Sequence, residues 1–151
     1  MFDTFYYKSP IGILEIKLQK DTIISIKIVN KINKNTSKTG YFSGIKRQLD
    51  KYFSGEKITF EFKTSPDGTY FQKKVWTVLK KIPYGETRTY GEIAKMINNP
   101  LVQRAVGNAC AKNPILILIP CHRVISQNGL GGFAYGVKAK EQLLNIEKIK
   151  L

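Results

Sequence analysis

The chain has 151 residues, 42% of them hydrophobic, and its 25 Lys and Arg against 11 Asp and Glu give a formal net charge of +14. This length suits one ordinary domain or two small ones that share an interface, and the apolar content excludes wholesale disorder. The sequence shows no membrane span and no signal peptide, and two cysteines with one histidine predict neither a disulfide framework nor a structural zinc site. The charge favours an anionic partner, nucleic acid above all, unless the lysines serve only solubility.

The first half of the chain predicts a small antiparallel sheet followed by a helix. Segments rich in β-branched and aromatic residues predict strands at 2–8, 12–19 and 22–29. The polar stretch 30–40 predicts a loop. Apolar residues at helical spacing predict a helix over 42–53, which Ser54-Gly55 would end.

A linker is predicted at 63–69, where KTSPDG has turn chemistry. It would divide an N-terminal sheet-and-helix domain at 1–62 from a C-terminal domain at 70–151, so the predicted fold class is α/β (α+β). The C-terminal domain would begin with a helix over 71–82 that ends before Pro83.

Two short helices follow. Thr89 and Glu92 have the capping-box spacing and would open a helix over 90–97. Asn99-Pro100 predicts an N-cap with proline at the first position of a second helix, over 101–112. Helices joined by such a tight polar turn predict a helix-turn-helix, the second being the recognition helix; an ordinary helical hairpin is the alternative.

The stretch NPILILIPCHRVISQNG, 113–129, contains the one histidine of the chain beside one of its two cysteines. The apolar run Ile115–Ile119 predicts a short buried strand that leads to this pair. A glycine-rich loop at 129–136 would let backbone pass close to a ligand, and a last helix is predicted over 137–149.

Cys121, His122 and Glu147 could form a nucleophilic triad. A thiol reacts as thiolate, a histidine can take its proton, and a carboxylate can fix the histidine tautomer. Glu147 shares the helical face of Leu143 and Leu144, where a carboxylate needs a partner. The alternative is a structural cysteine, a polar residue at a strand end and a solvated carboxylate. Strand neighbours point to opposite sides, so Cys121 and His122 can cooperate only if the chain turns at Pro120-Cys121.

At IPCHRV, 119–124, the sequence resembles the active-site motif of the O6-alkylguanine-DNA alkyltransferases, which repair alkylated guanine by taking the alkyl group onto their own cysteine. FQKKVWTVLKKIPYGETRTYGEIA, QRAVGNACAKNP and GVKAKEQLLNIE are similar to the family in order and spacing, so the strong resemblance covers roughly 70–147. The first 60 residues or so resemble only the variable N-terminal domain.

The resemblance implies a role for each catalytic residue. Cys121 would accept the alkyl group, His122 would act as its base through a bridging water, and Glu147 would orient His122. Asn113 would bond across the turn that shapes the site. Tyr90 would turn the target phosphate and hydrogen-bond the guanine ring, so that the base does not leave as an anion.

The resemblance also implies how the chain would bind double-stranded DNA that contains O6-alkylguanine. Arg104 would fill the stack where the flipped nucleotide was, and Arg123 would contact the DNA. Independently of the resemblance, the small side chains of Ala105 and Gly107 on the recognition helix would allow close approach to DNA. The family implies the minor groove, whereas helix-turn-helix logic alone favours the major groove. The substrate pocket would be formed by Val124, Phe133, Ala134 and Lys140.

The sequence departs from the family in three places. The glycine loop is one residue shorter than in many relatives, Phe133 stands where tyrosine is common, and Cys110 replaces a larger apolar residue, which suggests a core position. No cofactor or metal is expected, and we expect a cytoplasmic monomer. The competing interpretations are a helix-turn-helix regulator without chemistry, which leaves the triad unexplained, and a cysteine hydrolase, which leaves Tyr90, Arg104 and the charge unexplained.

Overall fold

The computed structural model describes residues 2–33 and 40–150, and the N-terminal part is built on one sheet. Its strands, in the spatial order β1-β2-β3-β4, are β1 (Asp3–Ser9), β2 (Gly12–Gln19), β3 (Thr22–Val29) and β4 (Lys63–Thr64). The first three pair antiparallel and β4 pairs parallel to β3. The three predicted strands are therefore confirmed, while residues 34–39 of the predicted loop lie outside the described residues.

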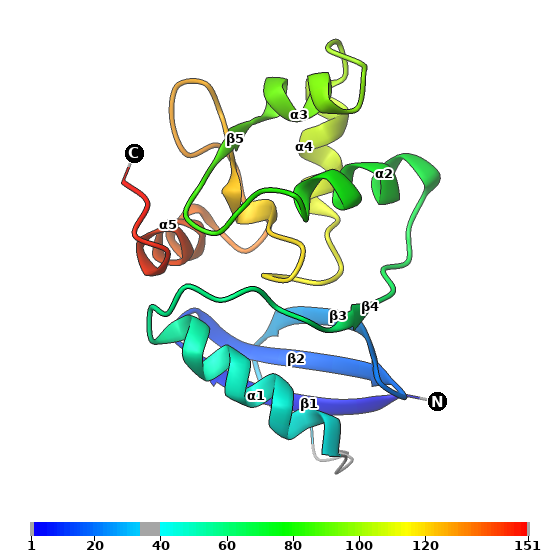
Figure 1. Cartoon of the computed structure of the whole chain (residues 1–151), viewed down its shortest axis with the longest axis vertical. Helices are drawn as coiled ribbons and strands as arrows, with labels where there is room; N and C mark the ends of the chain where they lie inside the picture. Colours follow the sequence, from blue (N-terminus) through cyan, green and yellow to red (C-terminus); the bar gives the residue numbers. More distant parts are fainter. Residues whose placement is uncertain (1, 34–39, 151) are drawn as a thin grey trace.

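Helix α1 (Gly40–Phe53) packs across the sheet (Figure 1). Ile45, Leu49 and Tyr52 lie on its buried side, and the ring of Phe42 stacks on Phe5 of β1 with centroids 4.4 Å apart. The predicted helix is thus confirmed, with its start two residues earlier. Strand β4 lies inside the predicted linker, and the division at 63–69 stays a prediction.

The C-terminal part is mainly helical, as predicted. Its elements are α2 (Tyr70–Leu79), β5 (Arg88–Thr89), α3 (Tyr90–Met96), α4 (Gln103–Ala111), the 3-10 helix η1 (Cys121–Arg123), β6 (Val124–Ile125) and α5 (Val137–Ile146). Strands β5 and β6 form a two-stranded parallel sheet. The helices lie on the side of the N-terminal sheet shown uppermost in Figure 1. Within the described residues, no helix is long and apolar enough to cross a membrane.

The ends of the helix-turn-helix pair differ in how well they were predicted. Thr89 caps α3 through the predicted capping box with Glu92. The cap predicted at Asn99-Pro100 is wrong, because α4 begins only at Gln103, after Val102, and has no side-chain cap. The backbone NH of Val102 instead donates to the carbonyl of Asn99 at 3.3 Å, so Pro100 lies within the turn and not in the helix.

The strand predicted at Ile115–Ile119 is also wrong: this segment folds back on itself. Ile117 has a φ of +75°, and the NH of Leu118 donates to the carbonyl of Leu116 at 2.9 Å, which is a classic γ-turn. Burial explains the error, since all five residues are buried and an apolar run carries no period that distinguishes a strand from a buried turn. Only the two ends keep strand-like pairing, Ile115 with Ile26 and Leu116 with Ile119.

One apolar core runs through both halves of the molecule. Leu14, Ile16 and Ile26 from the sheet belong to the same buried cluster as Trp76 and Ile115. Backbone bonds cross the same boundary: the NH of Ile26 donates to the carbonyl of Pro114 at 2.9 Å, and the NH of Leu116 donates to that of Ile26 at 3.0 Å. The segment 113–120 is therefore held against the edge of β3, and this fixes the residues that follow it.

Candidate active site

Two successive tight turns position Cys121. After the γ-turn at Ile117, Pro120 adopts φ −81° and ψ 63°, and the NH of Cys121 donates to the carbonyl of Ile119 at 2.8 Å, an inverse γ-turn. The next residues wind into η1, so Cys121 and His122 are neighbours on a helical turn and not on a strand. The turn at Pro120-Cys121 that their cooperation requires is therefore present.

Asn113 ties this turn together. Its side-chain amide donates to the carbonyl of Ile119 at 2.7 Å and to Sγ of Cys121 at 3.1 Å, while its Oδ1 accepts from the NH of Ile115 at 2.9 Å. Burial raises the pKa of the Cys121 thiol, and the Asn113 hydrogen bond and the charge of Lys140 oppose that rise. Asn113 thus both shapes the turn and stabilises negative charge on the sulfur.

In front of Cys121 lies a cavity of about 560 Å³, large enough for a purine base. Its walls come from α3, α4, η1 and the glycine-rich loop. The lining residues are Tyr90, Gln103, Arg104, Gly107, Asn108, Cys110, Ala111, Cys121, Gly132, Phe133 and Ala134. Of the predicted pocket residues, Phe133 and Ala134 line it, whereas Val124 and Lys140 are buried beside it. Cys110, expected in the core, is half-buried and belongs to the wall.

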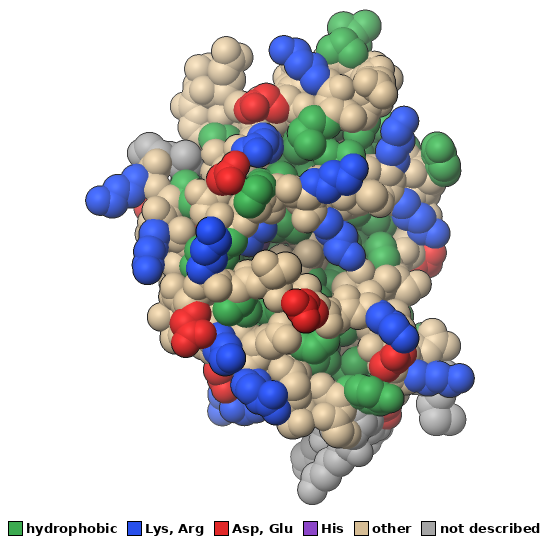
Figure 2. All heavy atoms as spheres, in the orientation of Figure 1, with side chains coloured by type: hydrophobic (Ala, Val, Ile, Leu, Met, Phe, Trp, Pro, Cys, Tyr) green, Lys and Arg blue, Asp and Glu red, His purple; other side chains and the backbone are tan. Residues whose placement is uncertain are grey.

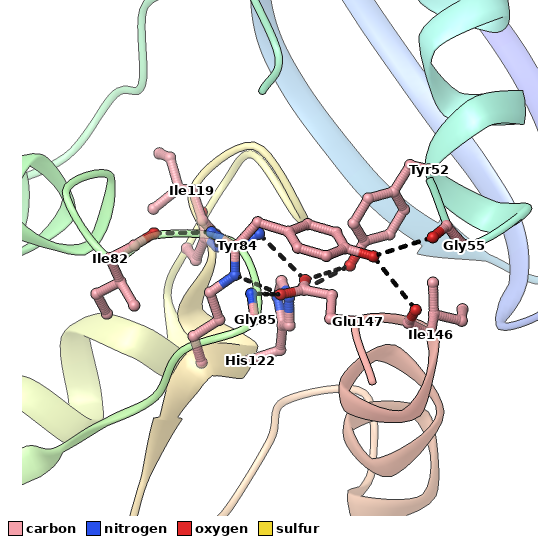
Figure 3. Close-up of polar contacts among 11 residues, drawn as sticks. Tyr52, Gly55, Ile82, Tyr84, Gly85, Ile119, His122, Ile146 and Glu147 are labelled. Carbon is pink, nitrogen blue, oxygen red and sulfur yellow. Dashed lines mark hydrogen bonds and ion pairs between the residues drawn. The ribbon is translucent and has the colours of Figure 1, made fainter. Parts of the chain in front are cut away.

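Behind Cys121 lies a closed network centred on Glu147, the residue that follows α5 (Figure 3). Oε2 of Glu147 lies 2.6 Å from Nε2 of His122 and accepts from the hydroxyl of Tyr52 at 2.6 Å. The guanidinium of Arg123 donates from Nε to Oε1 at 2.8 Å and from one terminal nitrogen to Oε2 at 3.1 Å. The backbone NH of Gly85 donates to Oε1 at 3.2 Å.

Burial and the neighbouring charges together determine the protonation states of Glu147 and His122. His122 is 0% exposed and Glu147 2%. Burial alone would raise the pKa of Glu147, but hydrogen bonds and opposite charge from His122 and Arg123 outweigh it and lower the pKa to about 2. Burial lowers the pKa of His122, although Glu147 opposes this. The carboxylate is therefore ionised and the imidazole neutral near pH 7.

The network also fixes the histidine tautomer. An ionised Glu147 can only accept, so the proton of neutral His122 lies on Nε2 and the free lone pair on Nδ1. Nδ1 is buried and has no hydrogen-bond partner among the residues that the structure describes. Nδ1 is therefore the nitrogen able to take a proton. No direct bond joins His122 to Cys121 among the described contacts, which leaves the expected relay through water as a prediction.

Tyr90 and Lys140 meet at the wall of the pocket. Tyr90 opens α3 at the Thr89 cap, and the ammonium of Lys140 lies 5.8 Å from the centre of its ring. Lys140 is fully buried and donates to the carbonyls of Val124 at 2.5 Å and Gly132 at 3.0 Å. Lys140 thereby joins α5 to the glycine-rich loop. A Cβ on Gly131, which has a φ of +74°, would lie only 2.9 Å from the Tyr90 hydroxyl, so the loop approaches this close only as glycine.

The structure places some of the candidate DNA-binding residues at the pocket and buries another. Arg104 is exposed at the pocket, Gly107 lines it, and Ala105 lies half-buried on α4 between them. Arg123 does not fit the DNA contact predicted for it, because it is 8% exposed and its guanidinium bonds to Glu147 and to the carbonyl of Ile82. Figure 2 shows Lys and Arg side chains spread over the visible face, outnumbering the acidic ones.

Three contributors to the network escaped prediction: Tyr52, Tyr84 and Gly85. Tyr84 donates to the carbonyls of Ile146 at 3.3 Å and Gly55 at 3.5 Å, and its ring lies under Arg123. Of these three residues, only Tyr52 could have been predicted from the sequence. It stands on the apolar face of a helix, where a buried hydroxyl needs a partner that apolar neighbours cannot supply.

Comparison with known proteins places both halves of the chain in one family. Residues 70–149 match the family model described as the DNA binding domain of 6-O-methylguanine DNA methyltransferase. Residues 4–66 match the model described as the ribonuclease-like domain of the same enzyme.

Individual relatives agree. The chain is 58% identical over 108 residues to a methylated-DNA–protein-cysteine methyltransferase of Methanosarcina acetivorans, an alignment that covers 71% of this chain and 69% of the relative. It is 42% identical over 146 residues to that of Mycobacterium tuberculosis, covering 93% and 88%. The crystal structure of the M. tuberculosis O6-methylguanine methyltransferase superposes with a TM-score of 0.89 at 41% identity, over 98% and 93% of the two chains. A structure of the M. tuberculosis protein in complex with DNA gives 0.86 at 42% identity, over 95% and 91%.

Proposed function

This chain belongs to the 6-O-methylguanine DNA methyltransferase family, and from that premise we propose that Cys121 takes the alkyl group of O6-alkylguanine in double-stranded DNA, once per molecule. The protein is a DNA-repair enzyme, a methylated-DNA–protein-cysteine methyltransferase. The observation that carries the residue assignment is one arrangement: a thiol at the floor of a purine-sized cavity, backed by a buried His–Glu pair.

The reaction is a displacement at the alkyl carbon. His122 Nδ1 takes the thiol proton through a water, the Cys121 thiolate forms the S–C bond, and the bond between that carbon and guanine O6 breaks. Glu147 stabilises the imidazolium that forms. The leaving guanine keeps the electron pair of the broken bond and takes a proton from the Tyr90 hydroxyl, so that the base does not leave as an anion. The proton that His122 took from the thiol balances the one that Tyr90 gives up. No acyl intermediate forms, so the site needs no oxyanion hole.

The single turnover follows from the product. A thioether is stable because a thiolate leaves an alkyl carbon poorly, and burial raises the pKa of Cys110, the other thiol at the pocket wall, to about 12, so that it stays a weak nucleophile. Each molecule would therefore repair one lesion and stop.

Reaching the lesion requires nucleotide flipping, because O6 lies inside the duplex stack and unstacking costs a few kcal/mol. We assign Arg104 to the space left in the stack, since it lies exposed at the pocket on a helix of small and apolar residues. Insertion of one side chain in this way is typical of minor-groove binders. Affinity should then fall linearly with salt on a log–log plot, with a slope of about 0.9 per phosphate neutralised.

The alternative of a helix-turn-helix protein without chemistry is not favoured, because it gives no reason for a buried Cys121–His122–Glu147 arrangement in front of a cavity. A hydrolase would turn over, and it leaves Arg104 at the pocket unexplained. We propose a monomer, active in the cytoplasm, that needs no cofactor for this displacement.

The test is the mass of the intact protein after incubation with duplex DNA containing O6-methylguanine. We expect a gain of one methylene unit per molecule, mapped to the peptide of Cys121, with no further repair after one equivalent. Sustained turnover, or an adduct on Cys110, would contradict the assignment.

A further inference from the structure

Tyr52 links the N-terminal half of the molecule to the buried network. It lies near the C-terminal end of α1, and its side chain is fully buried. Its hydroxyl donates to the carboxylate oxygen of Glu147 that also faces His122, and it lies 3.4 Å from His122 Nε2 (Figure 3). Its ring contacts those of Phe53, Phe60 and Tyr84.

Packing does not account for this tyrosine. A phenylalanine would place the same ring against the same neighbours, without the cost of burying a hydroxyl. The charge of Glu147 is already compensated by Arg123, through two donors. The Tyr52 hydroxyl is the third hydrogen-bond donor to Oε2 of Glu147, after His122 and Arg123. It therefore helps to hold in place the oxygen that pairs with His122.

Resting on the proposed function, we propose that Tyr52 is a positioning residue for the alkyl transfer: its hydroxyl fixes Glu147 Oε2 opposite His122 and, by sharing that oxygen, limits how strongly Glu147 holds a proton on His122. The N-terminal half therefore takes part in activating a nucleophile that lies wholly in the C-terminal half. Tyr52 acts through Glu147 and touches neither Cys121 nor the substrate pocket.

The groups around His122 define what a change at Tyr52 would alter. They are Tyr52 from α1, Arg123 from η1, Lys140 from α5 and Glu147 after it, while Tyr84, from the segment after α2, acts on Glu147. Burial lowers the pKa of His122, Glu147 opposes this, and the charges of Arg123 and Lys140 add to the lowering. Removing the Tyr52 hydroxyl leaves the charges in place but gives Oε2 one donor fewer. Oε2 then stabilises the imidazolium more strongly, so the pKa of His122 should rise.

The experiment uses the fact that His122 is the only histidine of the chain, so that imidazole ¹⁵N NMR of the tag-free protein reports this residue alone. Tyr52→Phe should raise the pKa of His122. Because Oε2 is then no longer fixed opposite His122, the variant should also slow methyl transfer from a duplex substrate roughly tenfold, the low end for loss of an outer hydrogen-bond partner. The acid limb of the pH profile should move to higher pH. Tyr7→Phe is the matched control, since the Tyr7 hydroxyl donates to the Asp50 carboxylate at 2.7 Å in the same half of the molecule. It should leave both readouts unchanged.

An unchanged His122 titration and pH profile in folded Tyr52→Phe would overturn the proposal and leave Tyr52 a packing residue. A double-mutant cycle adds a second criterion: in a Glu147→Gln background, Tyr52→Phe should have no further effect, and a persisting effect would show that Tyr52 does not act through Glu147. The NMR titration needs no alkyl transfer. A shifted pKa in a protein that never gains the methyl group would therefore contradict the proposed function and not the link from Tyr52 to His122.

Discussion

The two sides of the Cys121 turn are built in opposite ways. Behind it, Tyr52, His122, Arg123 and Glu147 are buried and joined by hydrogen bonds of 2.6 to 3.1 Å. In front of it lies a cavity of about 560 Å³ whose walls are mostly small or uncharged residues, with one exposed arginine among them. The buried network behind Cys121 contains charged groups but no space for a substrate. The cavity in front of Cys121 has space for a substrate but few charged groups.

The contrast separates two tasks. A buried ion pair contributes little to stability by itself, but it holds its members in one geometry, and removal of one partner leaves an uncompensated charge. The open side can adapt to a base and to DNA without disturbing that geometry. Substitutions behind the turn should therefore affect every substrate alike, and substitutions in front that act only on the DNA should distinguish a duplex lesion from a free base.

Cys121→Ser removes the atom that the two sides share and should have the largest effect, complete loss of alkyl transfer, because a serine hydroxyl is a far weaker nucleophile at neutral pH than a thiol. Binding to duplex DNA should remain. Intact mass and fluorescence anisotropy measure the two properties. Cys110→Ser is the control and should still gain one methyl group; a methylated Cys121→Ser protein would show that another residue accepts the alkyl group.

Glu147→Gln tests the closed side. Transfer should slow by roughly 10²–10⁴-fold on duplex and free-base substrates alike, as is typical when acid–base help is lost. Stability should fall by about 3 kcal/mol, because the Arg123 charge stays buried without its partner. Single-turnover kinetics and urea unfolding give these values. Glu141→Gln, an exposed change of the same kind on α5, should alter neither. Unchanged transfer by a folded Glu147→Gln protein would refute the triad.

Arg104→Ala tests the open side. If Arg104 fills the space of the flipped nucleotide, its loss should slow repair of a duplex lesion by about 10²-fold or less, since unstacking costs only a few kcal/mol. It should spare free O6-benzylguanine, which enters the pocket without unstacking anything. Tyr90→Phe should slow both. Lys112→Ala removes the same charge at the far end of α4 and controls for general attraction to DNA. Equal losses on both substrates would assign Arg104 to the pocket itself.

Lowering the pH should destabilise the buried network of His122 and Glu147 before it affects the substrate cavity. The pKa values of His122 and Glu147 are both lowered by folding, so each contributes stability that is present above its unfolded value, 6.5 and 4.5, and is lost as pH falls. For Glu147, with a folded pKa of about 2, the contribution is about 3 kcal/mol and disappears between roughly pH 4.5 and 2. Urea unfolding from pH 7 to about 2 measures it, and in Glu147→Gln the part below pH 4.5 should be absent.

The sequence predicted the elements that have a regular residue pattern or a recognisable capping motif. The second and third strands alternate apolar and polar residues, and the Thr89 capping box marks one helix start by its chemistry. It failed where burial hides the pattern: Ile115–Ile119 is apolar throughout, and a γ-turn inside it leaves no polar residue to reveal it. The α4 start was wrong because Asn-Pro suits both a helix cap and the turn that the chain forms there.

The site shows the same division. Short-range motifs predicted Cys121, His122 and Asn113, which lie within nine residues of one another. The partners that complete the network come from far along the chain, and Tyr52 lies 95 residues from Glu147. Arg123 was expected to contact DNA, but the motif that contains it does not reveal the carboxylate that it pairs with. The ionised Glu147, which holds it inside, acquires its position only when α5 packs against η1.

The backbone bonds between Ile26 and the segment 114–116 have a further consequence, for self-association. β3 lies between β2 and the short β4, and β4 pairs only with Thr22 and Ile23. The middle of β3 is covered by Ile115, from the turn that leads to Cys121. An uncovered strand edge is a template for pairing with another chain. A molecule whose halves separate would expose this edge together with the apolar residues around Ile26, and we expect it to aggregate through β3. The turn that carries Cys121 thus also protects this edge of the sheet from other copies of the protein.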